Sequence, residues 1–561
     1  MKNKIFYIAF ALLGIVSCSE EFSETPAYGA LSADALQNEQ GINLMLIGAY
    51  SLLDGNSNTG GSDYARAADG WWLDVMSDDA HKGSTNGDQP DLYDFEIMNW
   101  TTTNGYLDAK WKGLYAGVNR ANAVIDLISR VQEGDFTQQL AEARFLRGHF
   151  NFELVKVFHN VAYISEQNFA DVEFNQPNTG PIWDEIEADF DFAVRNLPDT
   201  QSDVGRPTNW AATAFLGKVH LFQGEYTEAL GYLTTVINLG PYQLLTEYAD
   251  NFRLAGDNSS ESVFAIQFTA DGGLSYNGNI GGTLNYPGPI NCCGFYQPTQ
   301  DLVNAYQTDG SGLPLLDDYA NNTVPDVAND YGITSAQPFV PHAGPLDPRL
   351  DYTVGRRGIE YNGYGVHPGK DWVRSNFSDL SGPYTPKKNV YQADESANMG
   401  AGAWGEQRSG INYHFMRYSD VLLMAAEAAV ETNDIPNALT WVNMVRDRAR
   451  LMTYVSNDGG ATPAANYQIE AYPSFPDQEY ARRAVRMERR LEFGMEGHRL
   501  FDIRRWNVAG TTMSNYFVNE GRTVTSFAGL PAAYENKHDL APIPVGAIDL
   551  SGGILNQNPG Y

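Results

Sequence analysis

Apolar residues recur at helical intervals along much of this chain. In segments 111–131 and 136–158 they repeat every three or four residues, which is the period of an amphipathic α-helix. Helical patterns stop near residue 245 and resume at His414. Shorter segments with the same period are 41–53, 181–197, 209–224, 225–239 and 478–497. The pattern therefore predicts a mostly α-helical fold.

Two neighbouring segments, 209–224 and 225–239, resemble a tetratricopeptide repeat, which is a pair of antiparallel helices. Small residues, Gly217 and Ala229, stand where the two helices would touch and let them approach closely. A second copy of the spacing begins at Ala426. Because the copies are far apart, they predict a scaffold of helical pairs that is interrupted by an insertion.

The predicted insertion, 246–413, is rich in Gly, Pro, Asn and Tyr and has few long helical patterns. Its segment 271–294 consists almost wholly of turn-forming residues. We therefore expect an irregular, loop-rich region here. It separates an N-terminal helical scaffold (31–245) from a C-terminal part (414–561) with further helical pairs. We expect the irregular end of that part, 531–561, to pack across the scaffold.

The N-terminus has the pattern of an export signal. Two lysines precede the apolar run Ile5–Val16, which is too short to span about 30 Å of hydrocarbon as a helix. The run ends at Ser17-Cys18, which resembles the lipobox of bacterial lipoproteins. We predict a signal peptide at 1–17, lipidation of Cys18 and a polar tether at 18–30. The alternative is an ordinary secretory signal.

Charge excludes some classes of partner. The 561 residues hold 37 Lys and Arg against 69 Asp and Glu, a formal net charge of −32. Without a concentrated basic patch, such a chain is unsuited to nucleic acid or to an anionic lipid surface. Because 43% of the residues are hydrophobic, the charge does not indicate disorder. We therefore expect a folded protein that does not bind nucleic acid.

Several long motifs are spread over nearly the whole chain after the signal. They are NRAN (119–122), EARFLRG (142–148), MRYSDVLLMAAEA (416–428), ERRLEF (488–493), GHR (497–499), DIRRW (502–506), LAPIP (540–544) and NPGY (558–561). These motifs, in this order, resemble the SusD/RagB-like family of Bacteroidetes surface lipoproteins. The acidic pair that follows Cys18 also resembles the surface-export signal of such lipoproteins.

The resemblance implies a function in glycan uptake. Its members capture oligosaccharides at the cell surface and close over a SusC-like, TonB-dependent barrel transporter in the outer membrane. It implies a lipid-anchored, non-catalytic protein, for which we expect neither a cofactor nor a metal. The arginines of its C-terminal motifs are expected in buried or half-buried ion pairs: Arg489, Arg490, Arg499, Arg504 and Arg505.

Two other functions stay open at this point. The first is capture of peptides by a member of the same family. The second is a surface glycoside hydrolase, because 69 acidic residues do not exclude a catalytic carboxylate pair. Sequence motifs for zinc proteases, Walker-type phosphate-binding loops and serine hydrolases are absent. The segment 400–405 matches the dinucleotide-binding pattern G-x-G-x-x-G, but it lacks the flanking strand and helix that the pattern requires.

Sugar recognition needs flat apolar rings against the C–H faces of the sugar and planar polar groups for its hydroxyls. In the resembling family the site is built from loops near the N-terminal helices and from the inserted region. The segment 70–106 holds three tryptophans in a polar, turn-rich context. The candidates from this half are Asp54, Asn56, Trp72, Asp78 and Trp100, with Trp71 and Asp79 beside them.

The inserted region supplies further candidates. Cys292 and Cys293 are adjacent, and a disulfide between them would form a stiff apolar ledge beside Tyr296 in a glycine-rich loop. The alternative is two free or merely structural thiols. The remaining candidates are Arg357, Trp372 and Tyr384, with Arg356, Tyr361 and Tyr364 near them. The negative charge favours neutral glycans such as fructans, glucans or mannans over acidic ones, unless arginines cluster at a site.

Overall fold

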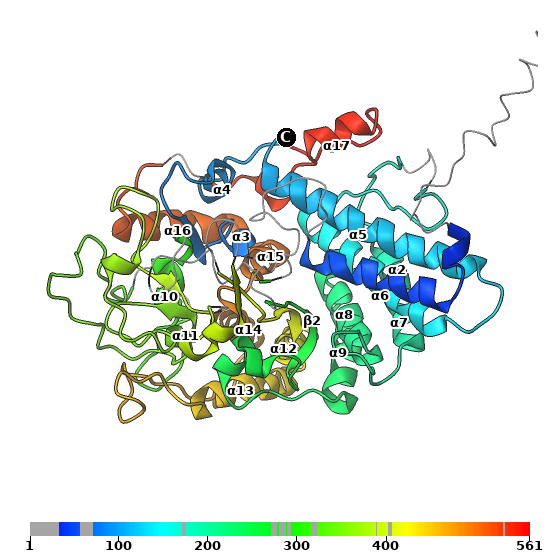
Figure 1. Cartoon of the computed structure of the whole chain (residues 1–561). Helices are drawn as coiled ribbons and strands as arrows, with labels where there is room; N and C mark the ends of the chain where they lie inside the picture. The colour runs from blue at the N-terminus through cyan, green and yellow to red at the C-terminus, as the bar shows by residue number, and fades with distance from the viewer. Residues whose placement is uncertain are drawn as a thin grey trace, which may run out of the picture.

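The computed structural model describes residues 33–55, 71–170, 175–270, 278–279, 288, 293–316, 323–388, 390–401, 407–530 and 533–561. The predicted signal peptide, the tether and Cys18 lie outside these residues. The protein is mostly α-helical, as predicted (Figure 1). Among the described residues, no helix is long and apolar enough to cross a membrane.

Six helices of the N-terminal half lie together on one side of the molecule (Figure 1). From α5 to α9, each packs against the next along the chain, and α2 packs on α5 and α6. They are α2 (Glu39–Tyr50), α5 (Gly105–Arg130), α6 (Thr137–Phe158), α7 (Trp183–Asn196), α8 (Asn209–Gln223) and α9 (Tyr226–Leu239). Helix α5 begins earlier than predicted, because the Asn104 side chain accepts hydrogen bonds from the backbone N–H groups of Tyr106 and Leu107.

The two predicted helical pairs are present. The first is α8 with α9, and the second is α12 (Tyr418–Glu431) with α13 (Ile435–Leu451). Gly217 lies at the contact of the first pair, where an added Cβ would be 2.8 Å from Leu233 Cγ. Helix α12 packs against α9, which joins the pairs in space although the insertion separates them in sequence.

Two glycines of this pair give a matched test of the close approach. In α9, Gly231 has no atom within 4 Å of an added Cβ, so Gly231→Ala should stabilise the protein by about 1 kcal/mol through helix propensity. The same change at Gly217 should instead destabilise the protein by about 1–2 kcal/mol, because overpacking outweighs propensity. Urea unfolding of both variants measures the difference. Equal effects at the two positions would contradict the packing.

The inserted region contains short elements. Its helices are α10 (Gln300–Ala305) and α11 (Leu350–Thr353), and its two-stranded antiparallel sheets pair β4 (Val354–Gly355) with β5 (Thr385–Pro386) and β6 (Met399–Ala401) with β7 (Gln407–Ser409). Its short 3-10 helices are η5 (Tyr248–Phe252), η6 (Leu254–Gly256), η7 (Lys370–Trp372) and η8 (Ala393–Asn398). A further sheet pairs β3 (Phe295–Pro298) with β1 (Ala80–Gly83) from the N-terminal half.

The prediction that helix resumes at His414 is wrong. Residues Tyr413–Arg417 form β8, which pairs antiparallel with β2 (Ser262–Ile266), and helix begins only at Tyr418. The rings of Phe264 and Phe415 stack across this sheet, with centroids 5.9 Å apart. Strand pairing therefore overrides the local helical pattern and ties the two ends of the insertion together.

The remaining helices follow the second pair or lie near the chain's N-terminal segments. They are η2 (Ala33–Leu36), η3 (Ser51–Asp54), α3 (Trp71–Asp74), α4 (Pro90–Glu96), α14 (Gln478–Phe493), α15 (Arg499–Arg505), α16 (Ala509–Thr523), η9 (Asn536–Asp539) and α17 (Val545–Leu550). The C-terminal end packs across the scaffold, as expected. The backbone N–H of Ala541 donates to the Val157 carbonyl at 3.0 Å, and the Asn558 amide donates to the Phe158 carbonyl at 2.7 Å.

Candidate functional site

The predicted tryptophans are core residues, so the prediction that they face a ligand is wrong. Trp72 is fully buried and stacks on Phe95, with ring centroids 5.4 Å apart. Trp100 is buried, and its indole N–H donates to the Tyr561 hydroxyl at 2.8 Å. Trp71 is buried as well. Large rings in a polar segment are covered here by residues from distant parts of the chain, which the local sequence does not reveal.

Three other predicted residues are also held inside the protein. Asp78 is buried and accepts two hydrogen bonds from the Arg499 guanidinium, at 2.7 and 2.8 Å. Tyr296 is buried and donates to Asp74 at 2.6 Å, and buried Tyr384 donates to Gln300 at 2.8 Å. Their polar groups already have intramolecular partners, so the prediction that these three contact a ligand is wrong.

The predicted residues of the inserted region do not meet in one cleft. The Arg357 guanidinium donates to the carbonyls of Ser335 and Gln337 at 2.8 and 2.6 Å and so holds a loop in place, and its contact with sugar stays a prediction. Half-buried Trp372 packs edge-on against His367. Cys293 is buried and disulfide-bonded, whereas Cys292 lies outside the described residues, so the ledge stays a prediction.

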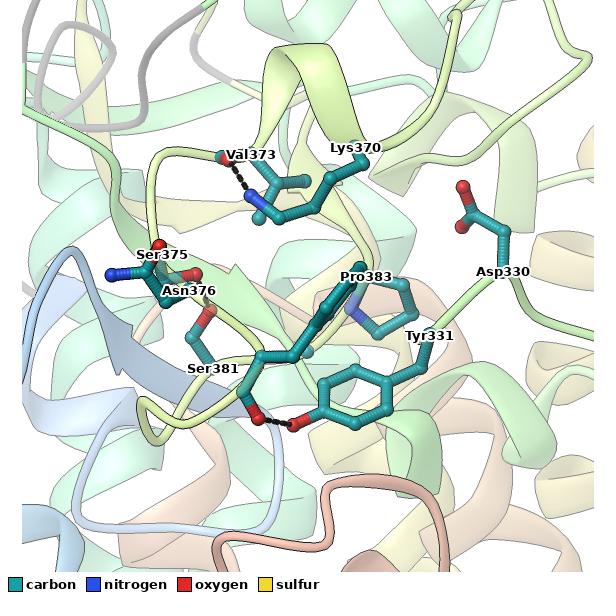
Figure 2. Close-up of a pocket in the computed structure, with 10 residues that line it drawn as sticks. Asp330, Tyr331, Lys370, Val373, Ser375, Asn376, Ser381 and Pro383 are labelled. Atoms are coloured by element: carbon teal, nitrogen blue, oxygen red, sulfur yellow. Dashed lines mark hydrogen bonds between the residues drawn. The ribbon is translucent and has the colours of Figure 1, made fainter. Parts of the chain in front are cut away.

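The niche beside these residues is too small for a sugar (Figure 2). Its volume is about 10 Å³, room for about one water molecule. Lys370 Nζ donates to the Val373 carbonyl at 2.6 Å, and the Tyr331 hydroxyl donates to the Phe377 carbonyl at 2.6 Å. These hydrogen bonds hold the segment 370–377 in a compact conformation and join it to Tyr331.

Asp54 lines an open cleft. This cleft, of about 380 Å³, lies between the end of α2 with η3, the turn before α8, and the end of β2 with the residues that follow it. We call it the Asp54 cleft; it is lined by Ile47, Tyr50, Ser51, Leu53, Asp54, Asp203, Val204, Gly205, Arg206, Ala265, Ile266, Gln267, Phe268 and Thr269. Asn56, two residues beyond Asp54, lies outside the described residues.

The Asp54 cleft combines apolar surface with fixed polar groups. Val204 is 70% exposed and Ile47 is 54% exposed, which leaves apolar surface at the cleft. Arg206 lies over the ring of Tyr50, with the guanidinium carbon 5.6 Å from the centroid. Carboxylate, guanidinium and amide groups beside apolar side chains are the set that sugar recognition requires.

A buried carboxylate, Glu142, holds the polar wall of the Asp54 cleft in place. Its Oε2 accepts from the Tyr50 hydroxyl and from Arg206 Nη1, both at 2.7 Å. Burial, helped by Glu142, raises the pKa of the Tyr50 hydroxyl well above its usual value, so it stays protonated. Burial alone would lower the pKa of Arg206, but Glu142 raises it, so the guanidinium stays charged. Because Glu142 is engaged as an acceptor, it is poorly placed for acid–base catalysis.

The C-terminal arginines form buried ion pairs, as predicted, with one exception. Arg489 pairs with Asp420 and Asp502, Arg490 with Asp79, and Arg505 with Glu427. Arg504 does not follow the prediction, because its guanidinium donates to the carbonyl of His538. These guanidiniums connect elements that are far apart in sequence, which is a structural role.

A buried histidine, His81, links β1 to α4 and α16. Its Nδ1 is 2.6 Å from Glu96 and its Nε2 is 2.8 Å from Glu520, and all three side chains are buried. Burial alone would lower the pKa of His81, but Glu520 and Glu96 raise it to about 10. The imidazole is therefore charged at neutral pH and is a shared counter-ion of two buried carboxylates.

The raised pKa of His81 predicts that its contribution to stability depends on pH. Such a group contributes its stabilisation fully below its unfolded pKa of about 6.5 and loses it as pH rises through about 10. We expect the free energy of unfolding of the wild type to exceed that of His81→Gln by several kcal/mol at pH 6, and by much less at pH 10. Urea unfolding at both values measures this. A pH-independent difference would contradict the charged imidazole.

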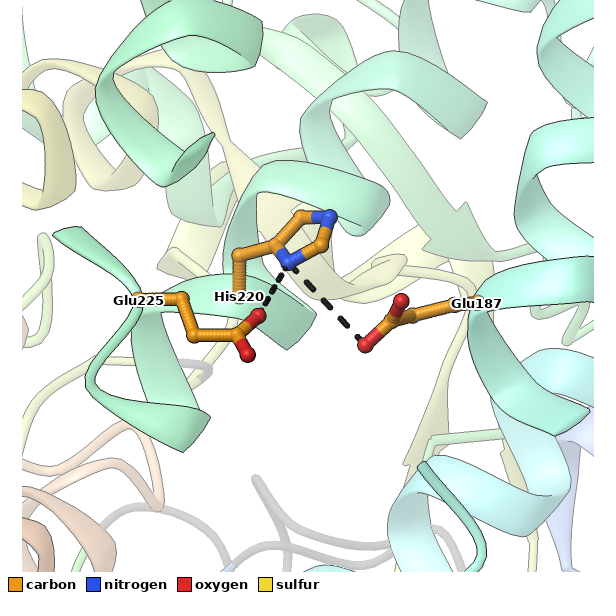
Figure 3. Close-up of side chains that lie close together, drawn as sticks. All are labelled: Glu187, His220 and Glu225. Carbon is orange, nitrogen blue, oxygen red and sulfur yellow. Dashed lines mark hydrogen bonds and ion pairs between the residues drawn. The ribbon is translucent and has the colours of Figure 1, made fainter. Parts of the chain in front are cut away.

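One group of side chains among the described residues has donor atoms close enough for a metal ion: Glu187, His220 and Glu225 (Figure 3). His220 Nδ1 is 2.7 Å from Glu225 and 4.0 Å from Glu187. Glu187 also accepts from the Gln223 amide at 2.6 Å. The imidazole stacks on Tyr232, with centroids 5.4 Å apart. These contacts join α7, α8 and α9, and we assign them a structural role.

Models of known protein families match both halves of the chain. A family model described as "SusD family" matches residues 260–561, more than half of the chain. A second model, described as "Starch-binding associating with outer membrane", matches residues 28–221. A SusD-like protein of Bacteroides ovatus is 23% identical over 588 residues, which cover 100% of this chain and 92% of that protein. SusD-like protein P25 of Formosa agariphila is 24% identical over 537 residues, with 91% and 90% covered.

Solved structures share the fold. A laminarin-binding SusD-like protein superposes with a TM-score of 0.68 and 22% identity, covering 93% of this chain and 100% of that one. Surface glycan-binding protein A of Bacteroides thetaiotaomicron, in complex with laminarihexaose, superposes with a TM-score of 0.65 and 19% identity, covering 93% and 99%. At these identities, the likeness establishes the fold and not the ligand.

Proposed function

Because the chain belongs to the SusD family, we propose that it is a non-catalytic, surface glycan-binding lipoprotein that captures oligosaccharides for a SusC-like, TonB-dependent transporter. Two observations support this. The family model of the N-terminal half is described as starch-binding and associating with the outer membrane, and structural neighbours bind laminarin or laminarihexaose. Lipidation of Cys18 would anchor the protein at the outer membrane, with its folded part at the cell surface.

The observation that carries the proposal within this chain is the Asp54 cleft. Its exposed Val204 and Ile47 offer apolar contact, and Asp54 offers a carboxylate to sugar hydroxyls. Charge favours a neutral ligand here, because Asp54 and Asp203 both line the cleft and would repel an acidic sugar. We propose a neutral glucan, fructan or mannan, with a glucan of the laminarin type tested first.

Calorimetric titration against oligosaccharides of laminarin, inulin and mannan tests the proposal. We expect saturable binding to at least one of them and none to a mixture of random peptides. Tighter binding to the peptides would favour the peptide-capturing alternative. Chromatography of the sugars after long incubation tests the other alternative, since released shorter sugars would show a hydrolase.

A further inference from the structure

A second cleft lies where α14, α15 and the start of α16 meet. It measures about 380 Å³ and shares no lining residue with the Asp54 cleft. In Figure 1 these three helices lie apart from α2, whose end lines the Asp54 cleft. We call it the Arg486 cleft. Its size is that of a small-molecule site and exceeds what a single inorganic ion fills.

Positive charge dominates the lining of the Arg486 cleft, in contrast to the acidic chain as a whole. Four arginines and two aspartates line it: Arg483, Arg486, Arg490, Arg499, Asp78 and Asp301. Arg490 lies 3.0 Å from Asp78 and 2.9 Å from Asp301, and Arg499 holds the other Asp78 oxygen at 2.7 Å. Arg490 also pairs with Asp79 at 2.9 Å. The charges of Arg490 and Arg499 are therefore matched by carboxylates in the wall, and Arg486, which also lines the cleft, pairs with none of them.

Arg486 contributes a positive charge to the cleft. It makes no hydrogen bond with the described residues, and its Nε is buried without a partner. One face of its guanidinium lies over Trp506, 4.9 Å from the ring centroid. Burial lowers the pKa of Arg486, although the nearby carboxylates of Glu427 and Glu431 raise it. A guanidinium that lies over an aromatic ring and makes no hydrogen bond with the described residues can accept a planar anion.

The opposite wall offers neutral donors. Thr511, Thr512 and Asn515 of α16 line the cleft, and their side chains form no hydrogen bonds with the described residues. Thr511 and Thr512 lie at the start of α16, where the partial positive charge of the helix dipole favours an anion. Hydroxyl and amide groups of this kind pair with sugar hydroxyls.

From these contacts we infer that the Arg486 cleft binds an acidic saccharide, with its carboxylate or sulfate group on Arg486 and its hydroxyls on Thr511, Thr512 and Asn515. An inorganic anion would leave most of the cleft empty. Glu427 and Glu431 lie near enough to offset part of the charge of Arg486, but a neutral sugar would leave its guanidinium without a hydrogen-bonded anion. The inference goes beyond the neutral-glycan function of the Asp54 cleft and does not depend on it.

Titration calorimetry with two probes at low salt tests the inference: trigalacturonic acid for the carboxylate and a sulfated carrageenan oligosaccharide for the sulfate. We expect the wild type to bind at least one of them. Arg486→Gln should weaken that binding at least tenfold, since it removes a charge-assisted hydrogen bond. The matched control is Arg482→Gln, one turn earlier on α14, because Arg482 already pairs with Glu431 at 2.6 Å. It should change binding by less than about twofold.

Three further readouts separate the outcomes. Binding of the acidic probe should weaken between low and high NaCl, because the interaction is ionic. The affinity for laminarihexaose should be unchanged by Arg486→Gln. If the wild type binds an acidic probe but does not bind laminarihexaose, only the neutral-glycan proposal is overturned. The inference is overturned if neither acidic probe binds, if inorganic sulfate binds as tightly as the oligosaccharides, or if both arginine variants weaken binding equally.

Discussion

The variant Glu492→Gln is expected to lose about 3–5 kcal/mol of unfolding free energy, because it removes the shared counter-ion of three buried arginines. The Glu492 carboxylate contacts Arg349 at 3.1 Å, Arg417 at 2.5 Å, and Arg448. All four side chains are buried. A neutral amide of the same shape leaves the three guanidiniums without their common partner. Urea unfolding at pH 7 measures the loss.

The same carboxylate should make the free energy of unfolding depend on pH in the acid range. Burial alone would raise the pKa of Glu492, but Arg448, Arg417 and Arg349 hold it well below its usual value. A carboxylate with a depressed pKa stabilises the protein above its unfolded pKa of about 4.3, and this contribution is lost as pH falls further. The difference in unfolding free energy between the wild type and Glu492→Gln should therefore become smaller below about pH 4.

Glu479 on the same helix provides the control. It pairs with Arg482 at 2.6 Å, but its side chain is 68% exposed. Glu479→Gln should change the unfolding free energy by less than about 0.5 kcal/mol, because exposed ion pairs contribute little. If Glu492→Gln costs no more than this control, the buried ion network does not stabilise the fold.

The second large effect is expected on binding. Asp54→Ala should weaken the affinity for the neutral oligosaccharide about tenfold to a hundredfold, since a hydrogen bond to a charged group contributes about 1.5–3 kcal/mol. The matched control is Asp549→Ala, an exposed aspartate of α17 that lies outside the Asp54 cleft. Calorimetric titration of both variants measures the difference.

Asp54 is half-buried at the end of η3, so its substitution needs a check on folding. Asp54→Asn keeps the shape and loses the charge, and it should bind with intermediate affinity. Both variants should unfold near the wild-type urea midpoint. Equal affinities of the wild type and a well-folded Asp54→Ala would remove the Asp54 cleft from the proposed site.

The helices were predictable because their signal is local. The period of apolar residues in 136–158 reports one buried face, and α6 spans Thr137–Phe158. Gly217 was predictable for the same reason, since a small residue within a helical pattern marks a close contact. The strand at His414 was not predictable, because β8 forms only when β2, which is far away in the sequence, lies beside it.

The site residues were harder to predict because exposure depends on distant residues. Trp100 is covered by Tyr561 and His538 from the end of the chain, which its polar neighbours do not indicate. Asp54 was predicted because it follows a predicted helix, and it lines the cleft for which we propose sugar binding. The opposite wall of its cleft, around Val204 and Gln267, was missed because it is assembled only by the fold.

A crystal structure of the protein with bound laminarihexaose tests the central claim most directly. The account predicts an intact hexasaccharide in the Asp54 cleft, with a sugar hydroxyl within hydrogen-bond distance of the Asp54 carboxylate and a ring against Val204 or Ile47. A hexasaccharide bound elsewhere, with the Asp54 cleft empty, would contradict the assignment of the site. Cleaved sugar in the crystal would contradict the non-catalytic function.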